Sequence, residues 1–352
     1  MKRPSKAPSV TVSDVAREAK VSKATAARVL GGYGTVSEMV RAAVLEAARA
    51  LDYRPNELAR SMTTGRSGSI GVVVGDIENP FFSLAVRGIS DVARLSGINV
   101  ILANSGEDVE AEKNAIRVLL AKQVDGLIVT PAQSSEIAHL KEIACPLALL
   151  DRALPELAVD TVTVDDRNAA LRATRILTEA GHRRIAYVTA AVLSGDFRGA
   201  ASRINTSTVR ERILGFIEGC READIEGAER NIHFGSGRSE SAHALMQRLL
   251  KSAERPTAIL ASDSVVALEL FKAIRECGLR IPQDISLITF HDADWTSVTT
   301  PPITVIDQPV YALGKSVAEL LIRRLKGDDR PPERIVLPTT IIERMSVGPS
   351  EA

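Results

Sequence analysis

The stretch that decides the fold of the N-terminal part is TVSDVAREAKVS, residues 11–22. Thr11 and Asp14 have the spacing of a capping box, in which each side chain bonds a free amide group of the first helical turn. The small and apolar residues that follow over two turns give one face that can pack against another helix. We therefore predict a short helix that begins just after Thr11.

A second and a third short helix are predicted to follow this one. Ser22 is placed to cap a helix over Lys23–Leu30, and Ser37 to cap another after the glycine-rich loop at 31–34. Apolar residues recur in the third helix at the helical period, namely Val40, Val44, Ala47 and Leu51. Two short helices separated by about four residues are typical of a helix-turn-helix.

The second helix of such a motif enters the major groove of DNA with its N-terminal end. That end carries five candidate DNA contacts: Ser22, Lys23, Ala24, Thr25 and Arg28. Lys23 and Arg28 can donate to guanine O6 and N7, while Ser22 or Thr25 can hold a phosphate. The spacing alone fits an ordinary three-helix bundle with a solvated basic face equally well, so both interpretations stay open at this point.

Charge is unevenly distributed along a chain whose net charge is zero. Residues 1–68 hold 12 Lys and Arg against 6 Asp and Glu, a balance of +6, which leaves 32 against 38, or −6, for residues 69–352. A small basic module attached to a larger acidic body favours a polyanion as the partner of the module alone. A charged segment that only solvates the chain is the simpler alternative.

From Ser69 the pattern changes to short apolar runs that alternate with helical stretches. In the first half, strands are predicted at Ile70–Val74, Asn99–Ala103, Gly126–Thr130 and Leu147–Leu150, and helices at Phe82–Ser96, Val109–Lys122 and Ser135–Ala144. In the second half, the predicted strands are Arg184–Thr189, Ala258–Ala261, Ile285–Phe290 and Ile303–Ile306, with short strands near Ile335–Leu337 and Thr340–Arg344. The predicted helices of that half are Asn168–Ala180, Val209–Ala223, Ser239–Leu250, Val265–Cys277 and Val310–Leu325. Buried strands separated by helices predict two doubly wound parallel sheets, with a cleft where their carboxyl ends face each other.

The length of 352 residues and the apolar content of 45% suit two or three domains with substantial cores. No apolar run approaches the roughly 18 residues of a membrane span, and no apolar segment follows the basic start, so neither a membrane span nor a secretory signal is expected. Cys145, Cys220 and Cys277 are too far apart for a zinc pattern or a disulfide framework and are expected to be buried free thiols in a reducing cytoplasm. The sequence has no P-loop, dinucleotide-binding glycine pattern, nucleophile elbow or metal-spaced His/Cys cluster, so no cofactor, metal ion or catalytic residue is predicted.

Several stretches resemble the LacI/GalR family of bacterial repressors: residues 11–22, Arg28–Leu30, and LDYRPNELARSM at 51–62. The body resembles the effector domain of that family, which is similar to periplasmic sugar-binding proteins, at NPFF (79–82), GHRRI (181–185), RPTAI (255–259) and GLRIPQDISL (278–287). The resemblance covers residues 10–345 and implies a DNA-binding transcriptional regulator. It implies an all-α helix-turn-helix domain at 10–54, a hinge helix and linker at 55–68, and a two-lobed α/β domain at 69–345 for effector binding and dimerisation.

The same resemblance implies that residues 55–64 form a hinge helix that orders on operator DNA. Met62, where the family more often has Leu, would insert into the minor groove and unstack a base step. Thr11, Asn56 and Ala59 are further expected DNA contacts, and a plain linker is the alternative for the segment. One small DNA-binding domain contacts too few bases to be specific within a genome. We therefore expect a homodimer on near-palindromic double-stranded operator DNA.

The effector is expected to be a sugar, a sugar derivative or a nucleoside bound between the two lobes. Eight candidate contacts lie at or near predicted strand ends: Phe81, Phe82, Asp151, Arg152, Asp263, His291, Asp292 and Trp295. The resemblance implies two more, Arg212 and Phe234, the second as a stacking aromatic. Aromatic side chains can stack on a sugar or base, and Arg212, which matches the family's ligand-contacting arginine, can bind a hydroxyl or carboxylate through two bonds. Structural alternatives are inward packing for the phenylalanines, a bridge between the lobes for Asp151 and Arg152, and helix capping for Asp263 and Asp292.

The sequence departs from the family pattern at two positions. Lys20 stands where the family usually has Gly in the turn, at a cost of about 1 kcal/mol if the residue keeps a positive φ. His291 replaces an acidic residue that often contacts ligand, which argues against a standard sugar pose. A loop at 194–208 is also longer than usual and rich in Ser, Gly and Ala.

Two other functions are compatible with two doubly wound halves. A periplasmic-type solute-binding protein is one, and residues 10–64 argue against it. A doubly wound enzyme is the other, and the lack of a catalytic constellation in the sequence argues against it.

Overall fold

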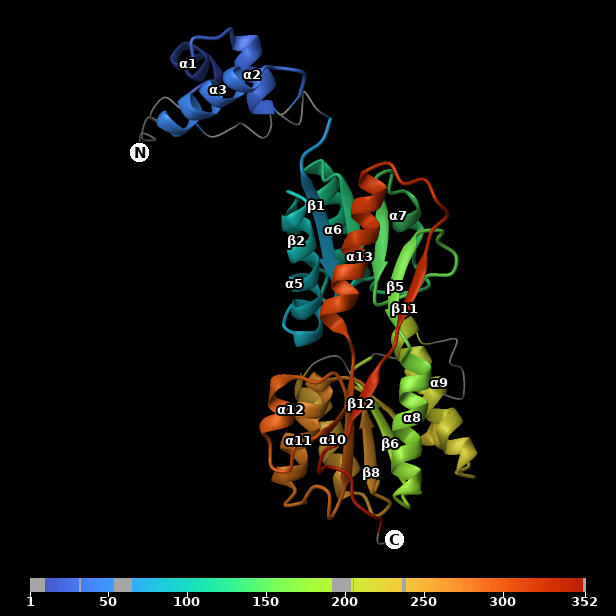
Figure 1. Cartoon of the computed structure of the whole chain (residues 1–352). Helices are drawn as coiled ribbons and strands as arrows, with labels where there is room; N and C mark the ends of the chain where they lie inside the picture. Colours follow the sequence, from blue (N-terminus) through green and yellow to red (C-terminus); the bar gives the residue numbers. More distant parts are fainter. Residues whose placement is uncertain are drawn as a thin grey trace, which may run out of the picture. The chain divides into compact units, whose positions relative to one another are not determined.

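A computed structural model describes residues 10–31, 33–53, 65–191, 204, 206–235 and 239–350, with the backbone alone for 239–244 (Figure 1). The chain divides into two compact units, one up to Gly68 and one from Ser69. The predicted hinge at 55–64 and residues 194–203 and 205 of the predicted long loop lie outside the described residues.

The N-terminal unit consists of α1 (Val12–Glu18), α2 (Lys23–Gly31) and α3 (Glu38–Ala50). The predicted capping box is confirmed, because the Thr11 amide donates to the Asp14 carboxylate at 2.9 Å and the Asp14 amide donates to Thr11 Oγ1. The three helices bury one small core, made of Val15, Ala16, Ala26, Val29, Val44, Ala47 and Ala48.

The two predicted serine caps differ. The Ser22 hydroxyl accepts from the Thr25 amide at 3.1 Å and caps α2 as predicted. Ser37 does precede α3, but the prediction of a side-chain cap is wrong, since its hydroxyl makes no such bond within the described chain. Ser37 is exposed, so water can satisfy the free amides there, and Glu38 supplies the negative charge that a helix start favours.

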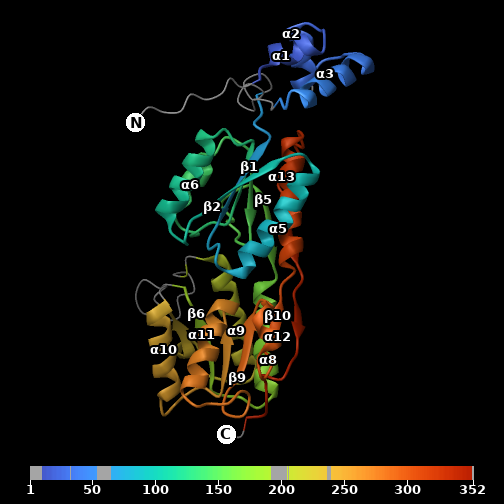
Figure 2. The ribbon, with the colours of Figure 1, turned by 90° about the vertical axis from the view of Figure 1, so that its left-hand side faces the viewer.

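The unit from Ser69 contains two sheets, each covered by helices on both faces, which we call the first and second lobes (Figures 1 and 2). The first sheet has the order β11-β5-β4-β3-β1-β2, and all its neighbours are parallel. Its strands are β1 (Ser69–Val74), β2 (Asn99–Asn104), β3 (Gly126–Val129), β4 (Leu147–Leu150), β5 (Asp160–Val164) and β11 (Arg334–Leu337). Its helices are α5 (Pro80–Leu95), α6 (Val109–Ala121), α7 (Ala138–Lys141) and α13 (Val310–Leu325).

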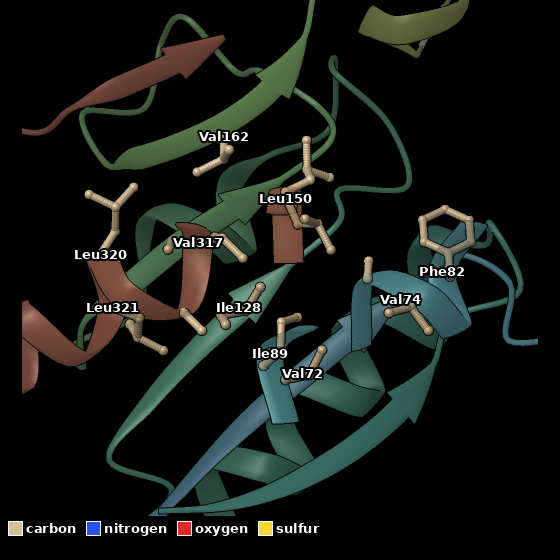
Figure 3. Packing of buried hydrophobic residues seen from close by; sticks show 14 of the residues in the cluster. Val72, Val74, Phe82, Ile89, Ile128, Leu150, Val162, Val317, Leu320 and Leu321 are labelled. Atoms are coloured by element: carbon tan, nitrogen blue, oxygen red, sulfur yellow. The ribbon is translucent and has the colours of Figure 1, made fainter. Parts of the chain in front are cut away.

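The alternation of side chains along the interior strand β1 explains why this sheet needs helices on both faces. Val72 and Val74 belong to the cluster that packs against α5 and α13, which Figure 3 shows around Ile89 and Val317. Val73 belongs to the opposite cluster, against α6 and α7. A strand that is apolar on both faces is stable only when both are covered.

Helices α5 and α13 lie side by side on one face of the first sheet (Figures 1 and 2). Glycines make this approach possible: a Cβ on Gly88 would collide with the Tyr311 carbonyl oxygen, and one on Gly314 with the carbonyl oxygen of Ala85. The last helix of the chain is thereby fixed to the first lobe.

The second sheet has the order β12-β10-β9-β8-β6-β7, with only the β10–β12 pair antiparallel. Its strands are β6 (Ile185–Thr189), β7 (Ile232–Phe234), β8 (Ala258–Ala261), β9 (Ser286–Phe290), β10 (Thr304–Asp307) and β12 (Thr340–Ile342). The associated helices are α8 (Asp166–Glu179), α9 (Ser207–Glu222), the short 3-10 helix η2 (Ala228–Asn231), α10 (Ser239–Lys251), α11 (Ser264–Glu276) and α12 (Asp294–Val298).

The predicted division of the body into successive halves is wrong. The first lobe does not end at Leu150, because β5, α13 and β11 also belong to it. The chain therefore passes between the lobes three times, from β5 to α8, from β10 to α13 and from β11 to β12.

The structure also corrects several individual elements. The predicted helix Ser135–Ala144 is reduced to the single turn α7, because residues 131–137 are irregular: the Ala132 amide donates to Glu112 at 2.6 Å, and Ile137 is buried. Strands β5 and β7 and helix α12 were not predicted, since β5 alternates Thr with Val and the other two have only three and five residues. The three cysteines are free, but the prediction that they are buried holds only for Cys220, because Cys145 and Cys277 are partly exposed.

Within the described residues, no helix combines the length and apolar character needed to cross a membrane. Among the same residues, no group of three or more His, Cys, Asp or Glu side chains is arranged to hold a metal ion.

Candidate functional site

The candidate DNA contacts of the helix-turn-helix lie at the start of α2. Ser22, Lys23, Ala24 and Arg28 are exposed, and Thr25 is half-buried. The Ser22 hydroxyl is engaged twice, by the Thr25 amide and by Thr25 Oγ1 at 2.8 Å. Lys23 and Arg28 place two exposed positive charges on this helix. Thr11 is exposed at the cap of α1, while Asn56, Ala59 and Met62 lie outside the described residues.

The turn between α1 and α2 holds Lys20 in the left-handed backbone region, with φ 55°. Across this turn the Val21 amide donates to the Ala16 carbonyl at 3.0 Å. A side chain in this backbone region costs about 1 kcal/mol, which explains why glycine suits the position better.

In the larger unit, the two lobes touch near the carboxyl ends of their strands. The Ala153 amide, after β4, donates to Ser207 Oγ at the start of α9 at 3.1 Å. The ring of Phe81 on α5 meets the imidazole of His291 edge-on, with their centroids 6.1 Å apart. Several predicted ligand contacts therefore come together at this junction.

Asp151 and His291 occupy corresponding places in the two lobes. Asp151 directly follows β4, and His291 directly follows β9. These strands correspond, because β4 is third in the order β11-β5-β4-β3-β1-β2 and β9 is third in the order β12-β10-β9-β8-β6-β7. Both residues have left-handed backbones, with φ 68° and 70°, and both are buried, at 5% and 6% exposure. Such backbone strain costs on the order of 1–3 kcal/mol and clusters at binding sites.

Each of these two residues also carries an open polar atom, by which we mean a buried nitrogen or oxygen that no described residue bonds. The atoms are Asp151 Oδ1 and His291 Nδ1. Burial raises the pKa of Asp151, against the opposing effect of Arg152 and Arg212. Burial lowers the pKa of His291, so its imidazole is neutral at neutral pH. A buried polar group without a partner is costly, and a ligand can supply that partner.

Arg212 on α9 lies in the interior of the second lobe, at 7% exposure. Its Nε donates to Asp166 Oδ1 at 2.7 Å, its Nη1 donates to the Ser262 carbonyl at 2.5 Å, and its guanidinium lies 4.1 Å from the centre of the Phe290 ring. Burial raises the pKa of Asp166 to about 7, although the charge of Arg212 acts to lower it. The guanidinium is thus held by three partners in a fixed orientation.

Arg152 has an equivalent fixed position in the first lobe. It binds both carboxylate oxygens of Glu107, at 2.5 and 2.7 Å, and the Pro131 carbonyl at 2.8 Å. Its Nε is an open polar atom, 3.8 Å from Asp151 Oδ2. The positive charge of Arg152 is therefore paired mainly with Glu107.

The remaining predicted contacts have structural partners. Asp263 caps α11, accepting from the amides of Val265 and Val266 at 2.9 Å. Asp292 binds Arg344 through both oxygens, at 2.8 and 2.7 Å.

The other aromatic candidates pack within the lobes. Phe82 lies in the first-lobe core beside Val74 (Figure 3). Phe234 is half-buried at the end of β7, and Trp295 packs against Phe271 with ring centroids 6.0 Å apart.

Some polar residues at the junction were not predicted. Thr130 directly follows β3 and Gln308 directly follows β10, and both carry open polar atoms. The signal that selected Asp151, a polar residue just after a buried strand, did not find them, because the predicted strands Gly126–Thr130 and Ile303–Ile306 end one residue later and one residue earlier than β3 and β10. Glu107 and Asp166 also belong here as partners of the two arginines, but nothing in the sequence indicates those pairings.

Comparison with protein families gives two matches along the chain. The model for bacterial regulatory proteins of the lacI family matches residues 11–56. The model for a periplasmic binding protein-like domain matches residues 174–347.

Comparison with individual proteins extends the similarity to almost the whole chain. Catabolite control protein A of Priestia megaterium is 31% identical over 339 residues, which cover 96% of this chain and 99% of that protein. The structure of the Lac repressor dimer bound to operator and the anti-inducer ONPF is 26% identical, with a TM-score of 0.82, and the match covers 97% of this chain and 100% of that one. The complex of the transcriptional regulator CelR with cellobiose is 28% identical, with a TM-score of 0.67, over 96% of this chain and 99% of that one.

Proposed function

This chain belongs to the lacI family of bacterial regulatory proteins, and we propose that it is a repressor whose affinity for operator DNA is set by a small molecule bound between its lobes. Its relatives are transcriptional regulators, so the alternative of a doubly wound enzyme is abandoned. We propose that the effector is a sugar, a sugar derivative or a nucleoside. The complex of the relative CelR with cellobiose supports a sugar.

The observation that carries this proposal is the matched pair Asp151 and His291. Two corresponding strained turns, one in each lobe, each place an open polar atom in a buried position. A fold optimised only for stability would relax such strain and bond such atoms. A ligand that bonds both atoms joins the two lobes, because the residues belong to different sheets.

The remaining candidates support the site in different ways. Arg212 and Arg152 are held rigidly beside it, and Phe81 makes an edge-on ring contact with His291. Asp263, Asp292, Phe82, Phe234 and Trp295 are proposed as outer contacts or supports, since each already has a structural partner or packs into a lobe core.

We propose that a homodimer reads a near-palindromic operator. The Lac repressor, to which the chain is similar over nearly its full length, is a dimer on its operator. In each protomer Lys23 and Arg28 would contact base edges, Ser22, Ala24, Thr25 and Thr11 would lie against the DNA, and Asn56, Ala59 and Met62 would act from the hinge. Two DNA-binding domains contact twice as many bases as one, and this larger number is needed for specificity within a genome.

Ligand and DNA would then be coupled through the relative orientation of the lobes. The three passages of chain between the lobes allow rotation while keeping each sheet intact. An effector that binds one lobe orientation more tightly than the other shifts the operator affinity. The shift equals the difference between its binding free energies for the two orientations, typically about 1–3 kcal/mol.

A screen of thermal stability tests this proposal. The full-length protein is heated with pentoses, hexoses, sugar derivatives and nucleosides, and a true effector raises its melting temperature. The same compound must change operator affinity by about 5–150-fold. A compound that stabilises the protein and leaves operator binding unchanged would argue against the proposed coupling.

A further inference from the structure

Three passages of chain join the lobes, and the third of them, at residues 338–339 between β11 and β12, is connected to the other two (Figure 1). On the side of the first lobe, the amide of Asp165, which forms the first passage, donates to the Leu337 carbonyl at 3.2 Å. On the side of the second lobe, Thr340 pairs with Asp307, which ends β10 just before the second passage. Movement of the third passage would therefore disturb both of these connections.

Arg172 of α8 bonds the middle of this third passage. Its Nη2 donates to the Thr339 carbonyl oxygen and to Thr339 Oγ1, each at 2.8 Å. Thr339 is buried, at 5% exposure, so water competes little for these two acceptors. The preceding residue, Pro338, has a φ fixed by its ring and no amide hydrogen to donate. The passage is therefore held on both sides of a stiff residue, which leaves few backbone torsions about which the lobes can turn.

Helix α8 gives Arg172 a firm base in the second lobe. Ala173 of this helix is buried in the second-lobe core, and a Cβ on Gly215 of α9 would collide with the Arg167 carbonyl oxygen, so the two helices are in close contact. The bonds to residue 339 are nonetheless few. Nη2 makes both of them, and Nε of Arg172 is an open polar atom. A link of two hydrogen bonds at the end of a long side chain can break in one lobe orientation and form again in the other.

From these contacts, and resting on the proposed function, we infer that Arg172 is a positioning residue for the coupling between effector and DNA. Its two bonds to Thr339 favour the lobe orientation of this structure, and operator affinity depends on them. Coupling requires two arrangements of the chain that differ in free energy, and bonds that are made in one orientation and lost in the other supply such a difference. Arg172 is none of the candidate contacts to DNA or effector, so it acts through the passage that it holds.

Removal of the guanidinium tests the inference on the full-length protein. Arg172→Met keeps the length and the apolar stem of the side chain and loses both bonds. Affinity for DNA from the protein's own promoter region is measured with no compound added. Because the two lobe orientations bind operator differently, we expect the affinity of this variant to differ from that of wild type by at least about fivefold, which corresponds to about 1 kcal/mol.

Two matched variants separate positioning from a general loss of structure. Arg172→Lys still carries N–H donors for both oxygens of Thr339, so it should restore most of the wild-type affinity. Arg175→Met removes a guanidinium about one turn further along α8, where Arg175 pairs with Glu222 on the surface, and it should leave the affinity unchanged. A change in either of these variants as large as that in Arg172→Met would contradict the inference.

Thr339→Val provides a test from the other partner of the bonds. It removes the hydroxyl acceptor and keeps the carbonyl and the shape of the side chain, so it should change operator affinity in the same direction as Arg172→Met, but less. Combined with Arg172→Met it should add nothing, because the bond that it removes is already lost. Effects that simply add would count against the inference. If Arg172→Met does not fold, Thr339→Val decides alone, and an affinity equal to that of wild type would refute the inference.

The same measurements on the wild-type protein test the function on which the inference rests. Promoter DNA bound no better than unrelated DNA would overturn the proposed repressor, and the inference with it. Preferential binding that Arg172→Met leaves within about twofold of wild type would overturn the inference alone.

Discussion

Phe81 and His291 form an edge-on contact between the lobes, with ring centroids 6.1 Å apart. Phe81 comes from the first turn of α5 and His291 from the strained turn after β9. The contact depends on the relative position of the lobes, because Phe81 belongs to the first-lobe core and His291 follows β9 of the second sheet. It is therefore a sensitive place at which to test coupling.

Phe81→Leu should weaken the response to the effector without removing operator binding. The substitution keeps an apolar side chain in the first-lobe core, at a cost of about 1–2 kcal/mol, and removes the aromatic ring that His291 contacts. The measurement is operator affinity with and without effector. Phe82→Leu is the control, since Phe82 lies in the same core. Equal loss of response in both variants would assign the effect to core packing.

Arg212→Ala should destabilise the larger unit by about 1–3 kcal/mol, because the Asp166 carboxyl and the Ser262 carbonyl would remain buried without their partner. The double variant Arg212→Ala, Asp166→Asn removes the buried carboxyl and should recover part of that loss. Both variants should bind operator and fail to respond to the effector. Denaturant unfolding gives the stability, and a normal ligand response in the double variant would exclude Arg212 as a ligand contact.

Asp166 should make the stability of the larger unit depend on pH. Its pKa is about 7 in the folded protein and 3.8 by its ordinary value, so the folded state holds the extra proton between these limits. The stabilisation is complete below the unfolded pKa and is lost as pH rises through about 7. Asp166→Asn lacks this proton, so its free energy of unfolding relative to wild type should increase from about pH 5 to about pH 8. A difference that stays constant over that range would show that the Asp166 carboxyl does not take up this proton.

Lys20→Gly should stabilise the helix-turn-helix unit by about 1 kcal/mol, because φ 55° is costly for a residue with a Cβ. Lys20→Ala keeps the Cβ and should give no such gain. Hydrogen exchange of amides in α1 and α2 measures the effect within this unit. Equal protection in the two variants would mean that the lysine stem, and not the backbone, sets the stability.

Features that depend on neighbouring residues were predictable from the sequence. The capping box at Thr11 and Asp14 and the central strands follow from local spacing and apolar runs. The position of Asp151 just after a buried strand was predictable for the same reason. The alternating Thr and Val of β5, by contrast, do not form the continuous apolar run of a buried strand.

What the sequence could not reveal depends on residues far apart in the chain. Arg212 and Asp166 are 46 positions apart, and Asp292 and Arg344 are 52 apart, so neither pairing has a local signal. The left-handed backbones of Asp151 and His291 are likewise imposed by the tertiary fold, since neither residue is a glycine. The two-lobed organisation with three crossings also requires the pairing of β5 with β11, which are separated by most of the second lobe.

Binding of the purified full-length protein to DNA from its own promoter region, measured across a series of salt concentrations and with or without the effector, tests the central claim most directly. Our account predicts sequence-preferring binding that weakens steeply with salt, changes by about 5–150-fold with effector, and loses discrimination at one base position per half-site in Arg28→Ala. Binding that shows no preference for any sequence, or no salt dependence, would contradict it.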